Sequence, residues 1–566
     1  MKTFIVKLEN EVEGFSNKFK KYHFSLLFFL KFSLALIAIL LFGGLKTSGY
    51  KNGSSTFEDN GIALSQSLKT DILVTRPDEG VSKLINKLVY QFYSDRQFMP
   101  GWTVNTEANL QYRELIKLIK SANNYGLLAA DYSARELDSL EFQMKTSKIE
   151  KRHSLIRAEF EIKATQSAFR LLINLAMGLN PSDSLIAIND YSNGLADYLN
   201  YTLRNKKITE GFLAVQPHSK QYVSLQNALQ IFVHKVILDT SHFTIKQFQK
   251  SDSLVNRTLV NENFLSADSI KNQHAIEIAL MKLQKVYNLK QTGKKDDKTL
   301  EKLCKSTEDI FMLIALNLDR LRKNNLANDY SILVNIPEFK LYYTGINGHI
   351  TIYNVVVGKL LTPTPLLTSR MDRIIFNPCW NVPRSITINE ILPKMLADSM
   401  YLSKHDYSLM DSKGKPVDAA KINWNNLDNH QFNYYIRQQN CDNNALGALK
   451  FLFPNQYSVY LHDTPSKKLF NDKSRAYSHG CIRVQYPEKL ATQIILEGIN
   501  STGTSIDLGK IISSKETFEI KLGEPIPINI GYYTCTTDSL GEINFHDDIY
   551  AFDNAAIQKL FSGTLR

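Results

Sequence analysis

The sequence of 566 residues contains few cysteines, glycines and prolines: 5, 26 and 16, respectively. Five thiols are too few for the disulfide framework of a small secreted domain, and an odd number leaves at least one without an intrachain partner. The low glycine and proline content excludes a collagenous or low-complexity protein, and a hydrophobic fraction of 43% excludes a disordered one. At roughly 100–200 residues per domain, we expect about three or four domains.

The chain also has little net charge outside its N-terminus. Lys and Arg exceed Asp and Glu by 67 − 56 = 11. Residues 1–51 hold eight Lys and three Glu and therefore account for five of these charges. The remaining excess of six is not clustered into a phosphate-binding face. We predict no nucleic-acid partner.

The longest apolar run, Phe24–Leu45, is interrupted only by Lys31. About 20 such residues span a bilayer as a helix, and a lysine near the headgroups can extend its amine to the interface. The lysine-rich stretch 18–21 precedes the run, which predicts a cytoplasmic tail over 1–23 and an exported body. We expect a single-pass inner-membrane protein with its body in the periplasm. The alternative is a cleaved signal peptide with small residues at 47–49.

Helical periodicity dominates the next part of the chain. Apolar residues recur at three- and four-residue spacing from about 81 to 260. They predict a helical domain over 76–265, after a polar linker over 46–75. Such stripes form a core more often than a docking face. A second helical piece, Ala275–Leu303, has two short amphipathic stretches around a polar turn and predicts a small module over 266–328.

After residue 328 the pattern changes to that of β-strands. The segment Ser331–Tyr343 alternates, Gly345–Gly348 is a turn, and His349–Val357 is rich in β-branched residues, as in a hairpin. A similar pattern occurs near the C-terminus. The predicted fold class is therefore α+β: a helical scaffold domain and a small helical module, followed by a mainly β domain over 329–566.

One segment, Tyr460–Gln485, carries residues suited to catalysis. A thiol is a nucleophile only as the thiolate, and a histidine within hydrogen-bond reach can take its proton. A glycine beside the thiol lets the backbone fold tightly, so that nearby N–H groups can face an oxyanion. An arginine offers a planar fork for a carboxylate. The segment holds all of these groups: His462, Ser478, His479, Gly480, Cys481 and Arg483.

A zinc site formed by His462, His479 and Cys481 is the alternative. Structural zinc usually has closely spaced Cys or His pairs and a fourth ligand. Only His479 and Cys481 are close in this sequence, and a His-x-Cys pair is awkward for a single ion. We therefore predict neither a metal site nor a cofactor.

The segment resembles the catalytic domain of the L,D-transpeptidases. Their motif is His, a spacer of about 14–17 residues, and then Ser/Thr-His-Gly-Cys-x-Asn/Arg. His462 and residues 478–483 fit it throughout, and the arginine at 483 is typical of the large multi-domain branch. Further segments resemble signatures of that branch, in order: Ile332–Pro337, Asn377–Pro383, Asn444–Gly447, Phe453–Asn455 and Asp547–Tyr550.

Before Ser331 the resemblance is looser. The segment Arg96–Trp102 resembles part of the scaffold domain of this branch. Residues 275–303 resemble a small peptidoglycan-binding module: Gly293 and Thr299 match its turn, whereas two other positions of that turn depart from it. We expect the fold of this module to survive without glycan binding.

The resemblance implies a reaction and roles for the residues. A thioester on Cys481 would form with release of D-alanine from tetrapeptide stems of peptidoglycan, and an amine of a second stem would resolve it into a 3→3 crosslink. His462 would be the general base, oriented by a main-chain carbonyl, and the backbone at Gly480 and Cys481 would bind the oxyanion. The expected substrate-binding residues are Arg483, Ser478, His479, Tyr477, Trp380 and Asn381. Carbapenems would acylate the same thiol.

Alternatives remain for this site. Water could resolve the thioester, which would make the protein an L,D-carboxypeptidase. A non-catalytic wall-binding protein is also conceivable, but the intact Cys481 and His462 argue against it. His479 could be a second catalytic imidazole or could order the cysteine loop; we favour the second, because one base suffices. Protein partners beyond the stem peptides are not predicted.

Two further features lie next to the catalytic motif. The polar insertion at about 386–455 is long, and long insertions beside a site are often lids. The resemblance implies a capping subdomain here; the alternative is a static surface excursion. Cys379 stands where the family would have a residue without a thiol, and we interpret it as a small apolar filler.

Overall fold

The computed structural model describes residue 66 and residues 81–104, 107–147, 150–179, 194–324, 330–422, 433–499 and 507–561. The predicted cytoplasmic tail, the apolar run Phe24–Leu45 and almost all of the linker lie outside these ranges. Within them, no helix combines the length and the apolar character needed to cross a membrane.

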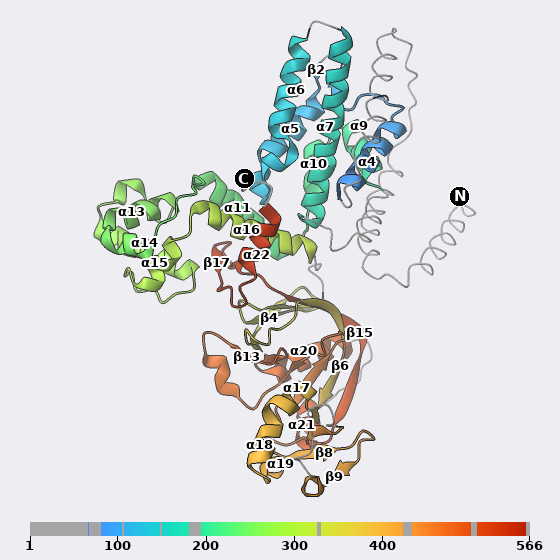
Figure 1. The fold of residues 1–566 in the computed structure, drawn as a ribbon, viewed down its shortest axis with the longest axis vertical. Helices are drawn as coiled ribbons and strands as arrows, with labels where there is room; N and C mark the ends of the chain where they lie inside the picture. Colours follow the sequence, from blue (N-terminus) through green and yellow to red (C-terminus); the bar gives the residue numbers. More distant parts are fainter. Residues whose placement is uncertain are drawn as a thin grey trace, which may run out of the picture. The chain divides into compact units, whose positions relative to one another are not determined.

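The first described region is helical, as the periodicity predicts (Figure 1). Side-chain caps explain where some of these helices begin: Asn109 accepts the Tyr112 N–H, and Ser219 accepts the Tyr222 N–H. Large aromatic side chains fill the core between the helices. The elements are α4 (Val81–Asp95), α5 (Leu110–Lys120), α6 (Ala134–Thr146), α7 (Glu150–Met177), α9 (Leu195–Arg204), α10 (Ile208–Ala214) and α11 (Lys220–Lys235).

A buried carboxylate on α7 holds the loop that follows α4. Glu161 accepts hydrogen bonds from the N–H groups of Gly101 and Trp102 at 2.8 and 3.0 Å, and from the Thr103 hydroxyl at 2.6 Å. The Tyr93 hydroxyl donates to it at 2.9 Å. Four donors therefore satisfy one charge in the core, as a buried ion requires.

The second helical region contains α12 (Ile245–Lys250), α13 (Asp252–Asn261), α14 (Gln273–Val286), α15 (Asp297–Leu303) and α16 (Thr307–Lys323). Gln284 organises the turn between α14 and α15. Its Oε1 accepts the N–H groups of Thr292 and Gly293 at 2.7 and 3.0 Å, and its Nε2 donates to the Thr299 hydroxyl at 3.0 Å. Gly293 has φ +66°, which favours glycine. The two positions that match the module's turn therefore have a structural role in it.

The β-rich region is a closed barrel. In order around it, the strands are β5 (Ile350–Gly358), β14 (Ile482–Val484), β12 (Leu461–His462), β11 (Leu449–Leu452), β6 (Leu367–Phe376), β15 (Phe518–Gly531), β3 (Ser331–Asn335) and β4 (Lys340–Thr344). The sheet closes because β4 also pairs with β5, and β13 (Ala476–Ser478) pairs with β5 as a further strand. One face of the strands forms an apolar core together with α20 (Pro487–Ile499).

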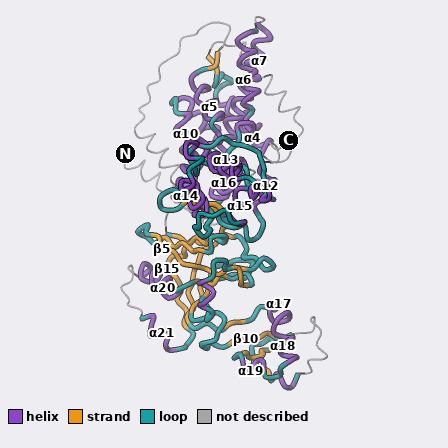
Figure 2. The backbone as a smooth tube through the Cα atoms, turned by 90° about the vertical axis from the view of Figure 1, so that its left-hand side faces the viewer, coloured by secondary structure: helices purple, strands orange, loops and turns teal. Residues whose placement is uncertain are grey.

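The insertion between β6 and β11 has its own small core and sheet. Its helical part comprises α17 (Arg384–Ile386), the π-helix η5 (Thr387–Ile391), α18 (Leu392–Ala397) and α19 (Tyr401–Lys404), which lie beside strand β10 (Figure 2). Its sheet has the order β7 (Trp380–Asn381), β10 (Tyr435–Gln438), β8 (Tyr407–Met410) and β9 (Pro416–Val417). Val382, Leu409 and Ile436 belong to a cluster separate from the barrel core. The insertion predicted at about 386–455 is thus a folded unit, but it starts earlier, at β7, and ends before β11, because Leu449–Leu452 pair with β6 in the barrel. Its role as a lid stays a prediction.

Helix α21 (Leu508–Ser514) packs against the barrel core. The C-terminal segment that follows β15, with β16 (Cys535–Thr537), β17 (Ile543–Phe545) and α22 (Asp553–Phe561), returns to the helical region. Asn317 on α16 pairs with Thr534 through both its amide nitrogen, at 3.1 Å, and its amide oxygen, at 2.9 Å. Tyr287 stacks on Phe545 with ring centroids 4.8 Å apart. Part of the predicted β domain therefore completes the core of the helices before it.

Candidate active site

Three adjacent strands place three polar side chains in one row. In the register of β11, β12 and β14, Lys450 lies opposite His462, and His462 lies opposite Arg483. Side chains alternate along a strand, and Leu461 and Ile482, the neighbours in sequence, point into the barrel core. Lys450, His462 and Arg483 therefore share the other face of the sheet.

Cys481 and Tyr460 lie on the same face of the sheet as this row. Each stands two residues before a member of the row, Cys481 before Arg483 and Tyr460 before His462, so both share its face. The Ile482 N–H donates to the Tyr460 carbonyl at 3.2 Å and holds the two segments together. The structure thus brings the predicted nucleophile and base to neighbouring strands.

The surroundings of Cys481 have opposing effects on the pKa of its thiol. Burial raises the pKa of Cys481 above its usual value, whereas Tyr460, through its backbone N–H and its hydroxyl, and the cations Lys450 and Arg483 all lower it. Burial is the largest of these effects. At neutral pH the resting group is therefore a thiol with cations and donors placed to stabilise its thiolate.

His462 is buried, with 5% of its surface exposed, and its tautomer is fixed. Its Nδ1 lies 2.5 Å from the main-chain carbonyl of Asp463. A carbonyl can only accept, so Nδ1 carries the proton and Nε2 keeps its lone pair. Burial first, and then the charges of Arg483 and Lys450, lower the pKa of His462 to about 3. The imidazole is neutral at neutral pH, and the expected main-chain carbonyl that orients it is confirmed.

Asp463 is itself held in place behind the imidazole. Its side chain is buried, accepts the Ala448 N–H at 3.0 Å and forms an ion pair with Lys467. A Cβ on Gly447 would lie 2.3 Å from its Oδ2, so only glycine fits there. This packing fixes the carbonyl that sets the tautomer of His462.

Ser478 and Thr364 order the cysteine loop. The Ser478 hydroxyl donates to the Cys481 carbonyl at 2.5 Å and accepts the Gly480 N–H at 3.1 Å, while the Thr364 hydroxyl donates to the Gly480 carbonyl at 2.9 Å. Gly480 has φ +110°, a conformation that favours glycine. The Gly480 N–H is thus engaged in the loop. Among the described residues, no hydrogen-bond partner is found for the Cys481 N–H, which leaves it available to an oxyanion.

The other predicted substrate-binding residues lie around this row. His479 is exposed, and its Nε2 is 2.5 Å from Glu390 of η5, which connects the cysteine loop to the insertion. Tyr477 is 44% exposed and donates to Asp472 at 2.9 Å. Trp380 contacts the Tyr460 hydroxyl. Asn381 is exposed and accepts from Arg437 Nε at 2.8 Å. Arg483 is half-buried, and no residue that the structure describes is a hydrogen-bond partner of its Nε.

Sequence reasoning missed Lys450, Tyr460 and Glu390. Lys450 is a lone charge in the apolar run Leu449–Phe453, which could have marked it. Tyr460 stands two residues before His462, the period at which side chains on one strand share a face. Nothing in the sequence links Glu390 to the cysteine loop.

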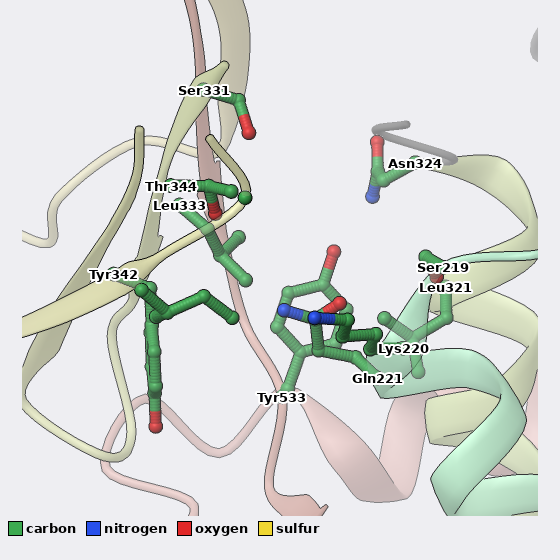
Figure 3. A pocket seen from close by; sticks show the side chains of 12 residues that line it. Ser219, Lys220, Gln221, Leu321, Asn324, Ser331, Leu333, Tyr342, Thr344 and Tyr533 are labelled. Carbon is green, nitrogen blue, oxygen red and sulfur yellow. The ribbon is translucent and has the colours of Figure 1, made fainter. Parts of the chain in front are cut away.

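The cavity drawn in Figure 3 lies elsewhere. It is bounded by helices α11 and α16 and by strands β3 and β4, with Lys220 and Leu321 among the helical residues and Leu333 and Tyr342 among those of the strands. None of the predicted site residues lines it. Within the described residues, no group of three or more His, Cys, Asp or Glu side chains is arranged to hold a metal ion.

A barrel that presents a cysteine and a neutral, oriented imidazole on one face has the parts of a thiol-dependent acyl-transfer site. Comparison with known proteins gives the particular family. Residues 329–509 match the family model for the L,D-transpeptidase catalytic domain, and residues 87–229 match that for the scaffold domain. Residues 329–509 are therefore an L,D-transpeptidase catalytic domain and residues 87–229 a scaffold domain, and the resemblance seen in the motifs is confirmed.

A curated relative from Haemophilus influenzae is named "Putative L,D-transpeptidase". It is 36% identical to this chain over 247 residues, which are 43% of this chain and 49% of the relative. The chain thus matches about half the length of that protein.

Proposed function

We propose that the protein forms 3→3 crosslinks in peptidoglycan through a thioester on Cys481. The observation that carries the proposal is that the thiol of Cys481, just before β14, and the neutral imidazole of His462 on β12 lie on the same face of neighbouring segments. The imidazole donates its Nδ1–H to the Asp463 carbonyl. Only the Nε2 lone pair of His462 then remains to take a proton. A base of this kind, positioned beside a nucleophile, is what amide acyl transfer requires.

In the first half-reaction, Cys481 Sγ attacks the carbonyl between the third and fourth residues of a donor stem. The thiol proton passes to His462 Nε2 and then to the leaving nitrogen as the C–N bond breaks. Free D-alanine leaves, and a thioester remains on Cys481. Because the resting thiol and imidazole are both neutral, proton transfer accompanies the attack and does not precede it.

In the second half-reaction, an amine on an acceptor stem attacks the thioester. His462 takes a proton from this amine and returns it to Sγ as the C–S bond breaks, so that a new amide joins the two stems. The oxyanion of both steps would lie at the Cys481 N–H, for which the structure shows no other partner among the described residues. Its proximity to Cys481 supports Arg483 as a carboxylate-binding residue.

The test is product analysis. Full-length protein in detergent is incubated with purified tetrapeptide muropeptides, and the products are separated and weighed by mass spectrometry. The proposal predicts free D-alanine and a crosslinked dimer. A trimmed tripeptide without dimer would make the protein an L,D-carboxypeptidase, and unchanged substrate would favour a non-catalytic wall-binding protein.

We also propose that the body of the protein works in the periplasm, held at the inner membrane by the segment Phe24–Leu45. The lysines before that segment support this orientation. A reporter enzyme fused after Arg566 should be active only outside the cytoplasm. Activity of the fusion inside the cell would overturn both the compartment and access to peptidoglycan.

A further inference from the structure

Two cations flank the imidazole of the site, and neither is neutralised by an acid. Lys450 and Arg483 lie opposite His462 from either side, on β11 and β14. Burial lowers the pKa of both, and Cys481 is the ionisable neighbour that favours their charged forms. No carboxylate of the described residues forms an ion pair with either one. A fold that half-buries two such charges incurs a desolvation cost, which an anion in this place would offset.

The contacts of Lys450 place its ammonium near the thiol of Cys481. Its Nζ lies 3.9 Å from the centre of the Tyr460 ring, in a cation–π contact. The Tyr460 hydroxyl contacts the thiol, and Lys450 itself lowers the pKa of Cys481. On the other side, the Arg483 Nε is buried and has no hydrogen-bond partner in the part of the chain that the structure describes, so at least one strong donor is unused there. The two cations thus stand on either side of His462, on the same face of the sheet.

The proposed reaction supplies an anion for these two cations. This step rests on the proposed function. In a tetrapeptide stem the leaving residue carries a free carboxylate on the carbon that bears the leaving nitrogen. Binding that carboxylate between Lys450 and Arg483 would place the leaving nitrogen over His462, whose Nε2 must give it a proton.

We propose that Lys450 and Arg483 together form a carboxylate seat, which binds the terminal carboxylate of the leaving D-amino acid and so selects stems with one residue beyond the scissile bond. A pentapeptide carries its carboxylate one residue further on, about 3.5 Å away, and misses the seat. Lys450 is the specificity residue that this assignment adds.

The experiment compares a tetrapeptide stem with its C-terminal amide. Release of the fourth residue is measured as kcat/KM for the full-length protein, for Lys450→Met and for Lys450→Arg. The exposed Lys468 serves as the matched control, as Lys468→Met. In the parent protein the amide should react about 30-fold more slowly than the acid, as expected for loss of a charge-assisted contact. In Lys450→Met the ratio of kcat/KM for the tetrapeptide acid to that for its amide should fall to about threefold, because one of the two charged contacts is lost. Lys450→Arg should keep the ratio of the parent, and Lys468→Met should resemble the parent.

Two outcomes would overturn the assignment. If Lys450→Met slows the acid and the amide equally, Lys450 acts on the thiol and not on the terminal carboxylate. A diaminopimelate stem has a second carboxylate on its third residue, whereas a stem with lysine there has none. If the effect of Lys450→Met disappears with lysine stems, the seat binds that side-chain carboxylate instead.

Binding without turnover separates this proposal from the proposed function. In the Cys481→Ala background, calorimetry should show that the tetrapeptide acid binds more tightly than the amide, and that Lys450→Met removes the difference. Such a preference, together with no release of D-alanine by the parent protein, would keep the seat and reject the reaction. Turnover by the parent with no preference for the acid would reject the seat and keep the reaction.

Discussion

The scaffold region and the catalytic face of the barrel differ in whether their buried charges have partners. In the scaffold, Glu161 accepts hydrogen bonds from two backbone N–H groups and two hydroxyls, so its charge is fully satisfied within the protein. On the barrel, Lys450 and Arg483 are half-buried beside Cys481 without an acid partner among the described residues. A satisfied charge fixes a fold, whereas an unsatisfied one is available to a ligand.

The largest expected effect is the loss of chemistry without loss of structure. Cys481→Ala should lower D-alanine release by about 10⁴-fold or more, because the residual rate of an enzyme without its nucleophile is small. The thermal unfolding midpoint should stay within a few degrees of the parent. Cys379→Ala is the matched control, since the one hydrogen bond found for its thiol within the described ranges goes to Gln439. A carbapenem adduct should map to the peptide containing Cys481; an adduct on Cys379 or Cys441 would place the nucleophile elsewhere.

A substitution in the scaffold core, Glu161→Gln, should lower the stability of the protein and leave its catalytic rate per folded molecule unchanged. Glu161→Gln places an amide among donors and should lower the free energy of unfolding by about 3 kcal/mol, as expected when one partner of a buried network is removed. Glu159 is exposed on the same helix, and Glu159→Gln should change the unfolding free energy by less than about 0.5 kcal/mol. Denaturant unfolding measures both. A fall in kcat per folded molecule of Glu161→Gln would contradict the separation of the two regions.

Within the site, the two imidazoles of His462 and His479 should contribute very differently to the acylation rate. His462→Ala should slow acylation by about 10²-fold or more, the range for a positioned base. His479→Ala should cost less in rate and act mainly on loop order, because its ring pairs with Glu390 and not with the thiol. Acylation rates of both folded variants decide the question, with circular dichroism as the check on folding. A larger loss for His479→Ala would reverse the two roles.

The pH dependence of the thiol follows from the directions of its pKa and that of His462. Burial raises the pKa of Cys481, so the thiolate fraction should grow about tenfold per pH unit between pH 6 and 8. The pKa of His462 is lowered to about 3, so no inflection should occur near 6.5. Alkylation of the Cys481 peptide by iodoacetamide measures this. A flat rate from pH 5 to 8 would instead indicate a thiolate–imidazolium pair at rest.

The pairing of His479 with Glu390 gives the smallest expected effect. If the insertion at 386–455 is a lid, Glu390→Gln should weaken its contact with the cysteine loop and change muropeptide turnover severalfold, with little change in the reaction of Cys481 with a small thiol reagent. Glu488→Gln, on α20, is the control. Equal changes in both reactions would indicate a general disturbance of the loop and not a gate.

Much of this arrangement could be predicted from local sequence. Alternation predicted the strand from Ser331, three- and four-residue spacing predicted the helices, and the short motif at 478–483 predicted Cys481 and, with its spacer, His462. These features depend on neighbours along the chain. The closure of the barrel through β4 and β5 does not, because no local pattern states which strand edges meet.

Contacts between segments that are distant in sequence could not be predicted. Whether Lys450 faces the core or the site depends on the register of β11 against β12, which a one-residue slip would reverse. The Gly480 N–H was expected at the oxyanion, but the Ser478 hydroxyl engages it, a detail set by loop geometry. Glu390 of the insertion and His479 of the cysteine loop are 89 residues apart in sequence and meet only in the folded structure.

The central claim is that Cys481 carries the acyl group. The most direct measurement is intact and peptide mass spectrometry of the full-length protein mixed with a tetrapeptide muropeptide and no added acceptor, quenched in acid within the first turnover. We expect an added mass equal to the muropeptide minus D-alanine, located on the peptide that contains Cys481 and absent from Cys481→Ala. Release of D-alanine without any adduct, or an adduct on another residue, would contradict the account.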